Sequence, residues 1–135
     1  MSNLLGKADF VENPGLVLEK VSTHEIKPDS FVYVRSMNAG ERGYFENEIA
    51  RYKESKGRTD FPRTFTIKVA AKCACDEKGN RIFADGDVAV LEKSNAAVVA
   101  RIAAAGQRLS GFSKEDIEEL EKNSVEAQPE DSPSD

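Results

Sequence analysis

The sequence is short of the residue types from which most reaction centres and metal sites are built. Its 135 residues include one histidine, two cysteines and no tryptophan. The histidine, His24, lies in a polar stretch beside Glu25. A lone imidazole needs a nucleophile or a metal-binding neighbour to act, so we expect His24 on the surface. We expect no catalytic residue and no cofactor, and the protein is not expected to be an enzyme.

The two cysteines, Cys73 and Cys75, are separated by a single residue. Neighbours this close rarely form a disulfide with each other, because the geometry is strained. A structural zinc site usually takes four Cys or His ligands, with two to four residues between paired cysteines. This chain does not offer that set, so we expect no metal and interpret both cysteines as small buried apolar side chains.

Loops that bind phosphate or calcium are also missing. The nine glycines are scattered along the chain and form no phosphate-binding loop. The segment 76–80, Asp-Glu-Lys-Gly-Asn, begins like a calcium loop. It lacks the alternating acidic ligands and the distal glutamate of such loops, so it predicts a plain turn.

The sequence has no run of about 18 apolar residues, so we expect no membrane-spanning segment. Residues 1–10 contain no apolar stretch long enough for a signal peptide. Without such a peptide, reduced thiols in the cytoplasm are the default. We therefore expect a cytoplasmic protein without membrane contact.

The formal net charge of −5 is unevenly distributed along the chain. Residues 113–135 hold nine acidic residues against Lys114 and Lys122, which leaves 17 basic and 15 acidic residues in 1–112. This nearly neutral body shows no clustered basic surface, so we expect no nucleic-acid partner.

The length suits one domain, which we assign to residues 26–123. Residues 1–25 form an N-terminal arm whose order the sequence leaves open, and Leu16–Leu18 within it fit either a short strand or a loose arm. Residues 124–135 are rich in Ser, Pro and acidic side chains. They cannot bury enough apolar surface to offset their ordering entropy, so we expect a disordered acidic tail.

The domain begins with the signature of a small β-hairpin. Residues 25–27 predict a short strand, 28–30 a turn, and the β-branched and aromatic run 31–35 a second strand.

Three helices with capping signals are predicted after the hairpin. Asn38 and Glu41 form a capping box for the first, with Phe45, Ile49 and Tyr52 on one face, Tyr44 beside it, and Gly57 at its end. Asp85 is expected to cap a short helix holding Val88 and Leu91. Ser94 is expected to cap a longer helix, which ends at Gly111. The apolar stripe of this longer helix is Val98, Ile102, Ala105 and Leu109.

A further helix is predicted from Ser113, with Ile117 and Leu120 facing inward.

Residues 61–75 fit two patterns. Apolar residues occupy every second position from 65 to 75, and such alternation is typical of a strand. These residues are Phe65, Ile67, Val69, Ala71, Cys73 and Cys75. Pro62 in a first turn favours a helix instead, as does the shared face of Phe61, Phe65 and Val69. The residues alone slightly favour the strand.

The order of segments is more informative than any single motif. The segments are VYVR at 32–35, AGER at 39–42, DEKGNRIF at 76–83, DGDV at 85–88, LEKS at 91–94, AAGQRLSGFS at 104–113 and DIEELEKN at 116–123, followed by the acidic tail. Over residues 26–123 this order resembles the tail assembly chaperones of long-tailed bacteriophages and prophages.

The resemblance implies an α+β, predominantly helical fold, with a small N-terminal β-hairpin packed on about four to five helices. It moves our prediction for residues 62–75 from strand to helix. It also implies a role in the host cytoplasm during tail morphogenesis. Such proteins bind the tape measure protein, keep it soluble and help recruit tail tube subunits. In many of these phages a programmed frameshift adds a longer form that contacts the tube protein.

Aromatic side chains on helix faces are the candidates for partner contact. Tyr44 and Tyr52 are our candidate partner-binding residues, with packing in the protein's own core as the alternative for each, whereas Phe45 and Ile49 are expected in the core. Self-association is a further expectation. The acidic tail either limits it by charge repulsion or is only a solvated end of the chain. The alternative function is a structural tail or head–tail connector protein that stays in the virion.

Overall fold

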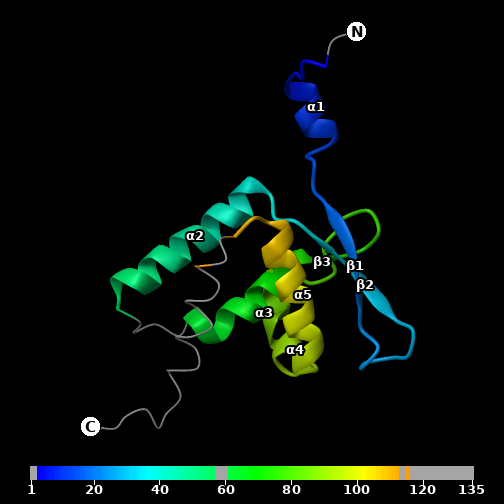
Figure 1. The fold of residues 1–135 in the computed structure, drawn as a ribbon, viewed down its shortest axis with the longest axis vertical. Coiled ribbons are helices and arrows are strands. Elements are labelled where there is room, and N and C mark those ends of the chain that lie inside the picture. Colours follow the sequence, from blue (N-terminus) through cyan, green and yellow to red (C-terminus); the bar gives the residue numbers. More distant parts are fainter. Residues whose placement is uncertain (1–2, 57–60, 113–114, 116–135) are drawn as a thin grey trace.

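The computed structural model describes residues 3–56, 61–112 and 115, and these form the α+β, predominantly helical fold that the sequence predicted (Figure 1). The predicted helix end at Gly57, the predicted helix from Ser113 and the acidic tail 124–135 lie outside the described residues. The elements in chain order are α1 (Lys7–Glu12), β1 (Leu18–Ser22), β2 (Phe31–Arg35), α2 (Ala39–Glu54), α3 (Phe61–Cys73), β3 (Ala74–Cys75), the 3-10 helix η1 (Asp85–Asp87), α4 (Val88–Glu92) and α5 (Ala96–Leu109).

The sheet is antiparallel in the order β1-β2-β3, with Val21 opposite Val32 and Val34 opposite Ala74. The hairpin prediction was right for β2 and wrong for its partner, because β1 is Leu18–Ser22 rather than residues 25–27. Val21 is buried between exposed neighbours, which is the period-two pattern of a strand with one covered face. Residues 18–22, which we had assigned to the N-terminal arm, therefore belong to the sheet.

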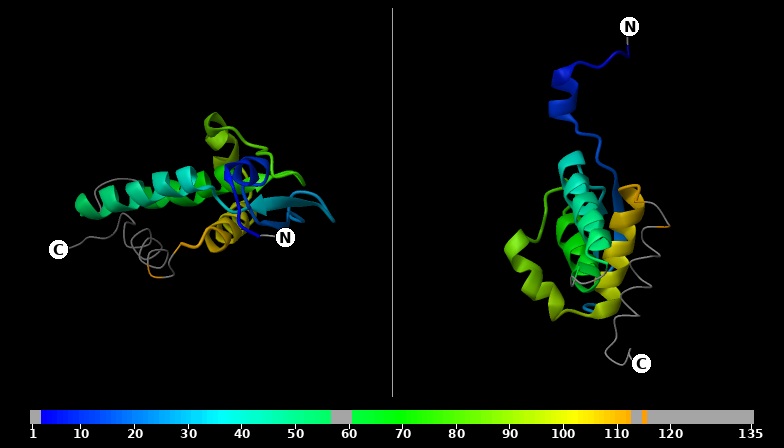
Figure 2. Two further views of the ribbon diagram at one scale, coloured as in Figure 1. Left: turned by 90° about the horizontal axis from the view of Figure 1, so that it is seen from above. Right: turned by 90° about the vertical axis from the view of Figure 1, so that its left-hand side faces the viewer.

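Helix α3 occupies the middle of the helical layer and packs against α2, α4 and α5 (Figures 1 and 2). The helix prediction for residues 62–73 is confirmed, and only Ala74 and Cys75 are extended. Because α3 has helices on several sides, Ala71 is buried as well as Phe65 and Val69. A helix that is buried on more than one face carries apolar residues on more than one face, and in α3 these happen to fall at every second position, as in a strand.

The predicted core stripe of α5 is confirmed: Val98, Ile102 and Ala105 are buried, and Leu109 is partly buried against them. The helix passes so close to α3 that a Cβ atom on Gly106 would lie 2.8 Å from the Cys73 sulfur. Glycine at this position therefore sets the distance between the two helices.

Two of the three predicted caps were misplaced. The capping box of α2 is confirmed: the Asn38 side chain accepts from the Glu41 N–H at 2.8 Å, and Glu41 accepts from the Asn38 N–H at 3.1 Å. The cap of α5 is Asn95 rather than Ser94, whose hydroxyl instead donates to the Val90 carbonyl. At η1, the cap position is Ala84 rather than Asp85, because the helix begins one residue earlier than predicted. The Ala84 N–H donates to the Asp87 carboxylate.

Two arginines of α5 tie the helix to the β1 side of the sheet. Arg108 and the Glu19 carboxylate form a two-pronged ion pair, with N–O distances of 2.9 and 2.7 Å. Arg101 pairs in the same way with Glu25 and also donates to the Ser22 carbonyl at 2.8 Å. Paired donors of this kind fix orientation as well as distance.

The close approach of α3 and α5 predicts opposite effects for two glycine-to-alanine changes. Gly106→Ala gains helix propensity but overpacks the contact with Cys73 and Val69, so we expect a net loss of about 1–2 kcal/mol in the free energy of unfolding. Gly43→Ala in α2 meets no atom within 4 Å, so we expect a gain of about 0.5–1 kcal/mol. Urea denaturation measures both. Equal effects would contradict the described packing.

The Arg101–Glu25 pair predicts a pH-dependent contribution to stability. Hydrogen bonds from Arg101 lower the pKa of Glu25 to about 2. A lowered folded-state pKa stabilises the fold above the unfolded-state value, and this contribution is lost as the pH falls toward 2. We expect Glu25→Gln to melt below the wild type at pH 7, and the two melting temperatures to converge on acidification.

The matched control is Glu92→Gln, because the Glu92 carboxylate has no ion pair among the described residues. This variant should melt close to the wild type at every pH. A gap between Glu25→Gln and wild type that stays constant from pH 7 to pH 2 would contradict the ion-pair explanation.

Candidate functional site

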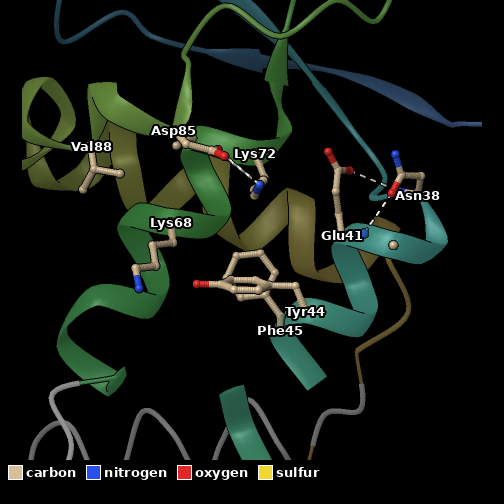
Figure 3. Close-up of a pocket in the computed structure, with 10 residues that line it drawn as sticks. Asn38, Glu41, Tyr44, Phe45, Lys68, Lys72, Asp85 and Val88 are labelled. Atoms are coloured by element: carbon tan, nitrogen blue, oxygen red, sulfur yellow. Dashed lines mark hydrogen bonds and ion pairs between the residues drawn. The ribbon is translucent and has the colours of Figure 1, made fainter. Parts of the chain in front are cut away.

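An open groove of about 630 Å³ lies between the N-terminal half of α2, the C-terminal half of α3 and the segment η1–α4 (Figure 3). We call it the α2–α3 groove. Its lining residues are Asn38, Gly40, Glu41, Tyr44, Phe45, Lys68, Ala71, Lys72, Asp85 and Val88.

The α2 wall presents one aromatic ring and buries the next. Tyr44 is 44% exposed, whereas Phe45 is fully buried beneath it. Their ring centroids are 5.1 Å apart in an edge-to-face arrangement, a geometry that aromatic pairs prefer. Phe45 is fixed in turn by an edge-to-face contact with Phe65 of α3. Core contacts therefore fix Phe45 in the floor of the groove, whereas the Tyr44 ring remains partly exposed to solvent.

The α3 wall carries two lysines. Lys68 and Lys72 lie four residues apart, so they share a helix face, and both line the groove (Figure 3). The Lys72 amino group lies 3.1 Å from the Asp85 carboxylate and 5.9 Å from the centre of the Tyr44 ring. Lys68 has no ion-pair partner within the part of the chain that the structure describes. With respect to the described residues, the groove thus keeps the Lys68 ammonium unneutralised.

Asp85 joins η1 to the end of α3 and limits the groove on that side. Arg81 donates to the Asp85 carboxylate at 2.9 Å, and Lys72 approaches the same carboxylate. A hydrogen bond from Arg81 lowers the pKa of Asp85 most, and a hydrogen bond from Lys72 lowers it further. The carboxylate therefore remains charged at neutral pH and holds the Lys72 amino group toward it.

A nearly buried ion pair supports the N-terminal end of α2. The Arg35 side chain is only 5% exposed and donates to both Glu41 oxygens, at 2.9 and 2.8 Å. Burial by itself would raise the pKa of Glu41, but hydrogen bonds from Arg35 and from the Asn38 backbone lower it. The pair joins strand β2 to the first turn of α2, and so positions the wall that carries Tyr44.

The two cysteines and His24 do not line the α2–α3 groove. Cys73 and Cys75 are free thiols in the core, as predicted, and burial raises the pKa of Cys73 to about 12, which leaves no reactive thiolate. His24 is exposed at the end of β1, where its ring nitrogen lies 3.0 Å from the Ser22 hydroxyl. Within residues 3–56 and 61–112, no group of three or more His, Cys, Asp or Glu side chains could hold a metal ion.

No helix that the structure describes combines the length and the apolar character that a membrane span requires.

The structure separates the two tyrosines predicted as partner-binding residues. Tyr44 lines the groove, whereas Tyr52 is 5% exposed and belongs to the core. The expectation that Tyr52 offers a contact surface is therefore corrected. Tyr52 follows Phe45 and Ile49 at helical spacing, and this face of α2 turns toward the core.

Sequence reasoning missed the residues on the opposite walls, above all Lys68, Lys72 and Val88. The spacing of the two lysines was a usable signal only once residues 61–73 were known to be helical. Val88 had been identified only as an inward residue of a short helix. No sequence signal placed it across from Tyr44.

The Arg35–Glu41 pair predicts a large effect from a small change. Glu41→Gln leaves the Arg35 guanidinium buried without a counter-ion. Loss of one member of a buried pair costs about 3–5 kcal/mol, and partial exposure of Glu41 reduces our expectation to about 2 kcal/mol. Urea denaturation at pH 7 measures the change.

Glu46→Gln is the matched control, because its ion pair with Arg42 is exposed and 3.3 Å long. Such surface pairs contribute less than about 1 kcal/mol, so this variant should resemble the wild type. Similar losses in both variants would show that burial of Arg35 is not what makes Glu41 important.

Comparison with known proteins adds no assignment. No protein-family model matches the chain, and neither a curated protein nor a solved structure matches it. The function is therefore inferred from the geometry of the α2–α3 groove together with the order of the sequence segments.

Proposed function

We propose that this protein is a tail assembly chaperone of a long-tailed bacteriophage or prophage. In this role it binds the tape measure protein in the host cytoplasm and helps recruit tail tube subunits. The segment order of residues 26–123 suggests the role. The observation that carries it on the structural side is the exposed Tyr44 ring above the rigid apolar floor of the α2–α3 groove.

The chemistry of the groove suits an apolar helical segment. Phe45, Ala71 and Val88 supply apolar contacts, and Tyr44 adds a large ring with a polar tip. Helical ligands commonly bind by placing a few apolar side chains, spaced by one turn, into such a groove. A tape measure protein is long and mostly helical, and it exposes apolar stretches until the tube surrounds it, so it offers many segments of this kind.

Reversible binding follows from the small size of the contact. Burying one Leu or Phe side chain contributes about 1.5–3 kcal/mol, and the ordering cost of association removes part of this. One groove therefore holds one segment weakly. Several copies along one tape measure chain shield it together, and each copy leaves easily when a tube subunit replaces it.

Tyr44→Ala tests the groove directly. A candidate tape measure protein is co-expressed with the wild type or with the variant, and the soluble, co-purified amount is measured. Truncation of a central interface aromatic typically costs more than 1 kcal/mol, so we expect about tenfold weaker binding for Tyr44→Ala.

Phe31→Ala is the matched control, since Phe31 is 46% exposed on strand β2 and does not line the groove. It should bind like the wild type. Failure of the wild type to co-purify with the tape measure protein or to improve its solubility would refute the chaperone proposal. Detection of the chain in purified virions by mass spectrometry would favour a structural tail component instead.

A further inference from the structure

Residues 3–17, the part of the N-terminal arm that precedes β1 and that we call the arm from here on, carry apolar side chains that the other described residues do not cover. Its large exposed residues include Leu4, Leu5, Phe10 and Val11, and helix α1 within it has no buried residue. Phe10 is 64% and Val11 72% exposed. Figure 1 and the right-hand view of Figure 2 both show α1 standing beyond the helical layer.

A helix as short as α1 needs a supporting surface. It has six residues, and isolated helices shorter than about 12–15 residues are marginal in water. The Asp9 carboxylate caps its first turn by accepting from the Gly6 N–H at 2.8 Å, so the sequence favours a helix at this position. Its apolar side chains, however, remain in solvent. The arm therefore has the features of a docking segment.

We propose that the arm of one copy docks in the α2–α3 groove of a second copy. In this contact, Phe10 and Val11 cover the apolar floor beside Tyr44. The charges are complementary: Glu12 at the end of α1 is acidic, and Lys68 in the groove is basic. Both side chains can take part, because neither has an ion-pair partner among the described residues. Asp9 already serves the helix cap, which leaves Glu12 to pair with Lys68.

The contact joins different surfaces, so its geometry determines the size of the assembly. Two copies that exchange arms reciprocally close into a dimer, whereas copies that donate to successive neighbours form rings or open chains. Each copy carries one arm and one groove, so the two are present in equal amount. This equality suits an arm as the occupant of the groove, and the crosslinking experiment below distinguishes the arm of a second copy from the chain's own arm.

Arm exchange would also regulate binding, and this part rests on the proposed function. A groove occupied by a neighbour's arm is covered until the tape measure protein displaces it. The chaperone would then store its apolar surface in self-assemblies and expose it only to its partner. A chain lacking residues 1–12 should therefore bind the tape measure protein at least as well as the full chain.

Sedimentation velocity over a range of concentrations tests the exchange. We expect the full chain to shift to faster sedimentation as its concentration rises, and the chain lacking residues 1–12 to remain monomeric. The double variant Phe10→Glu, Val11→Glu should also remain monomeric. Ile26→Glu, at an exposed apolar residue outside the arm and the groove, should assemble like the wild type.

Complementation identifies the groove as the receiving surface. Lys68→Glu keeps the arm but repels Glu12, so it should assemble more weakly than the wild type, and Glu12→Lys in the same chain should restore assembly. The Lys68→Glu chain mixed with the arm-deleted chain should form a one-to-one complex. A Lys68→Glu chain that assembles like the wild type would overturn the assignment of the groove.

Carbodiimide coupling of Glu12 to Lys68 in a mixture of unlabelled and ¹⁵N-labelled full chains distinguishes exchange from docking within one chain. Crosslinked peptides of mixed isotope composition support exchange. Crosslinks only between peptides of the same composition, or a full chain that is monomeric at all concentrations, overturn it. Tape measure binding by the arm-deleted chain is scored separately, so either proposal can fail while the other stands.

Discussion

The packing of α3 against α5 is the contact on which the other elements depend. At Gly106 the two helices approach so closely that no side chain fits between them, and Val69 and Cys73 of α3 fill the contact from the other side. This approach places α3 in the centre of the helical layer, with α2 and α4 packed around it (Figure 2). Helices α2 and α4 pack on α3 apart from each other, and the α2–α3 groove lies between them.

Charged pairs orient the peripheral elements around this apolar centre. Arg101 and Arg108 hold the β1 side of the sheet on α5, and Arg35 holds the first turn of α2 on strand β2. Paired arginine–carboxylate contacts add direction to attraction, whereas apolar packing alone tolerates rotation. The position of the Tyr44 ring is therefore determined by two different interactions, the Arg35–Glu41 pair above it and the Phe45–Phe65 contact below it.

Local signals predicted the parts of this structure that depend on short stretches of chain. Strand β2, the capping box of α2 and the apolar stripe of α5 are each encoded within a few turns or a single strand. Errors arose where several residues could serve equally well. Ser94 and Asn95 can both cap a helix, and residues 25–27 resemble a strand as much as 18–22 do. Tertiary contacts chose between them.

The sequence by itself determined that residues 39–54 and 96–109 form helices, because periodicity and capping act locally. It also indicated that the two cysteines are buried, because their spacing suits neither a disulfide nor a zinc site. Only the tertiary structure decided that Tyr52 faces the core while Tyr44 faces the groove, and that Lys68, Lys72 and Val88 lie opposite it. The α2–α3 groove combines side chains from α2, α3 and the segment η1–α4. Their relative placement follows from helix packing distances, which no local pattern encodes.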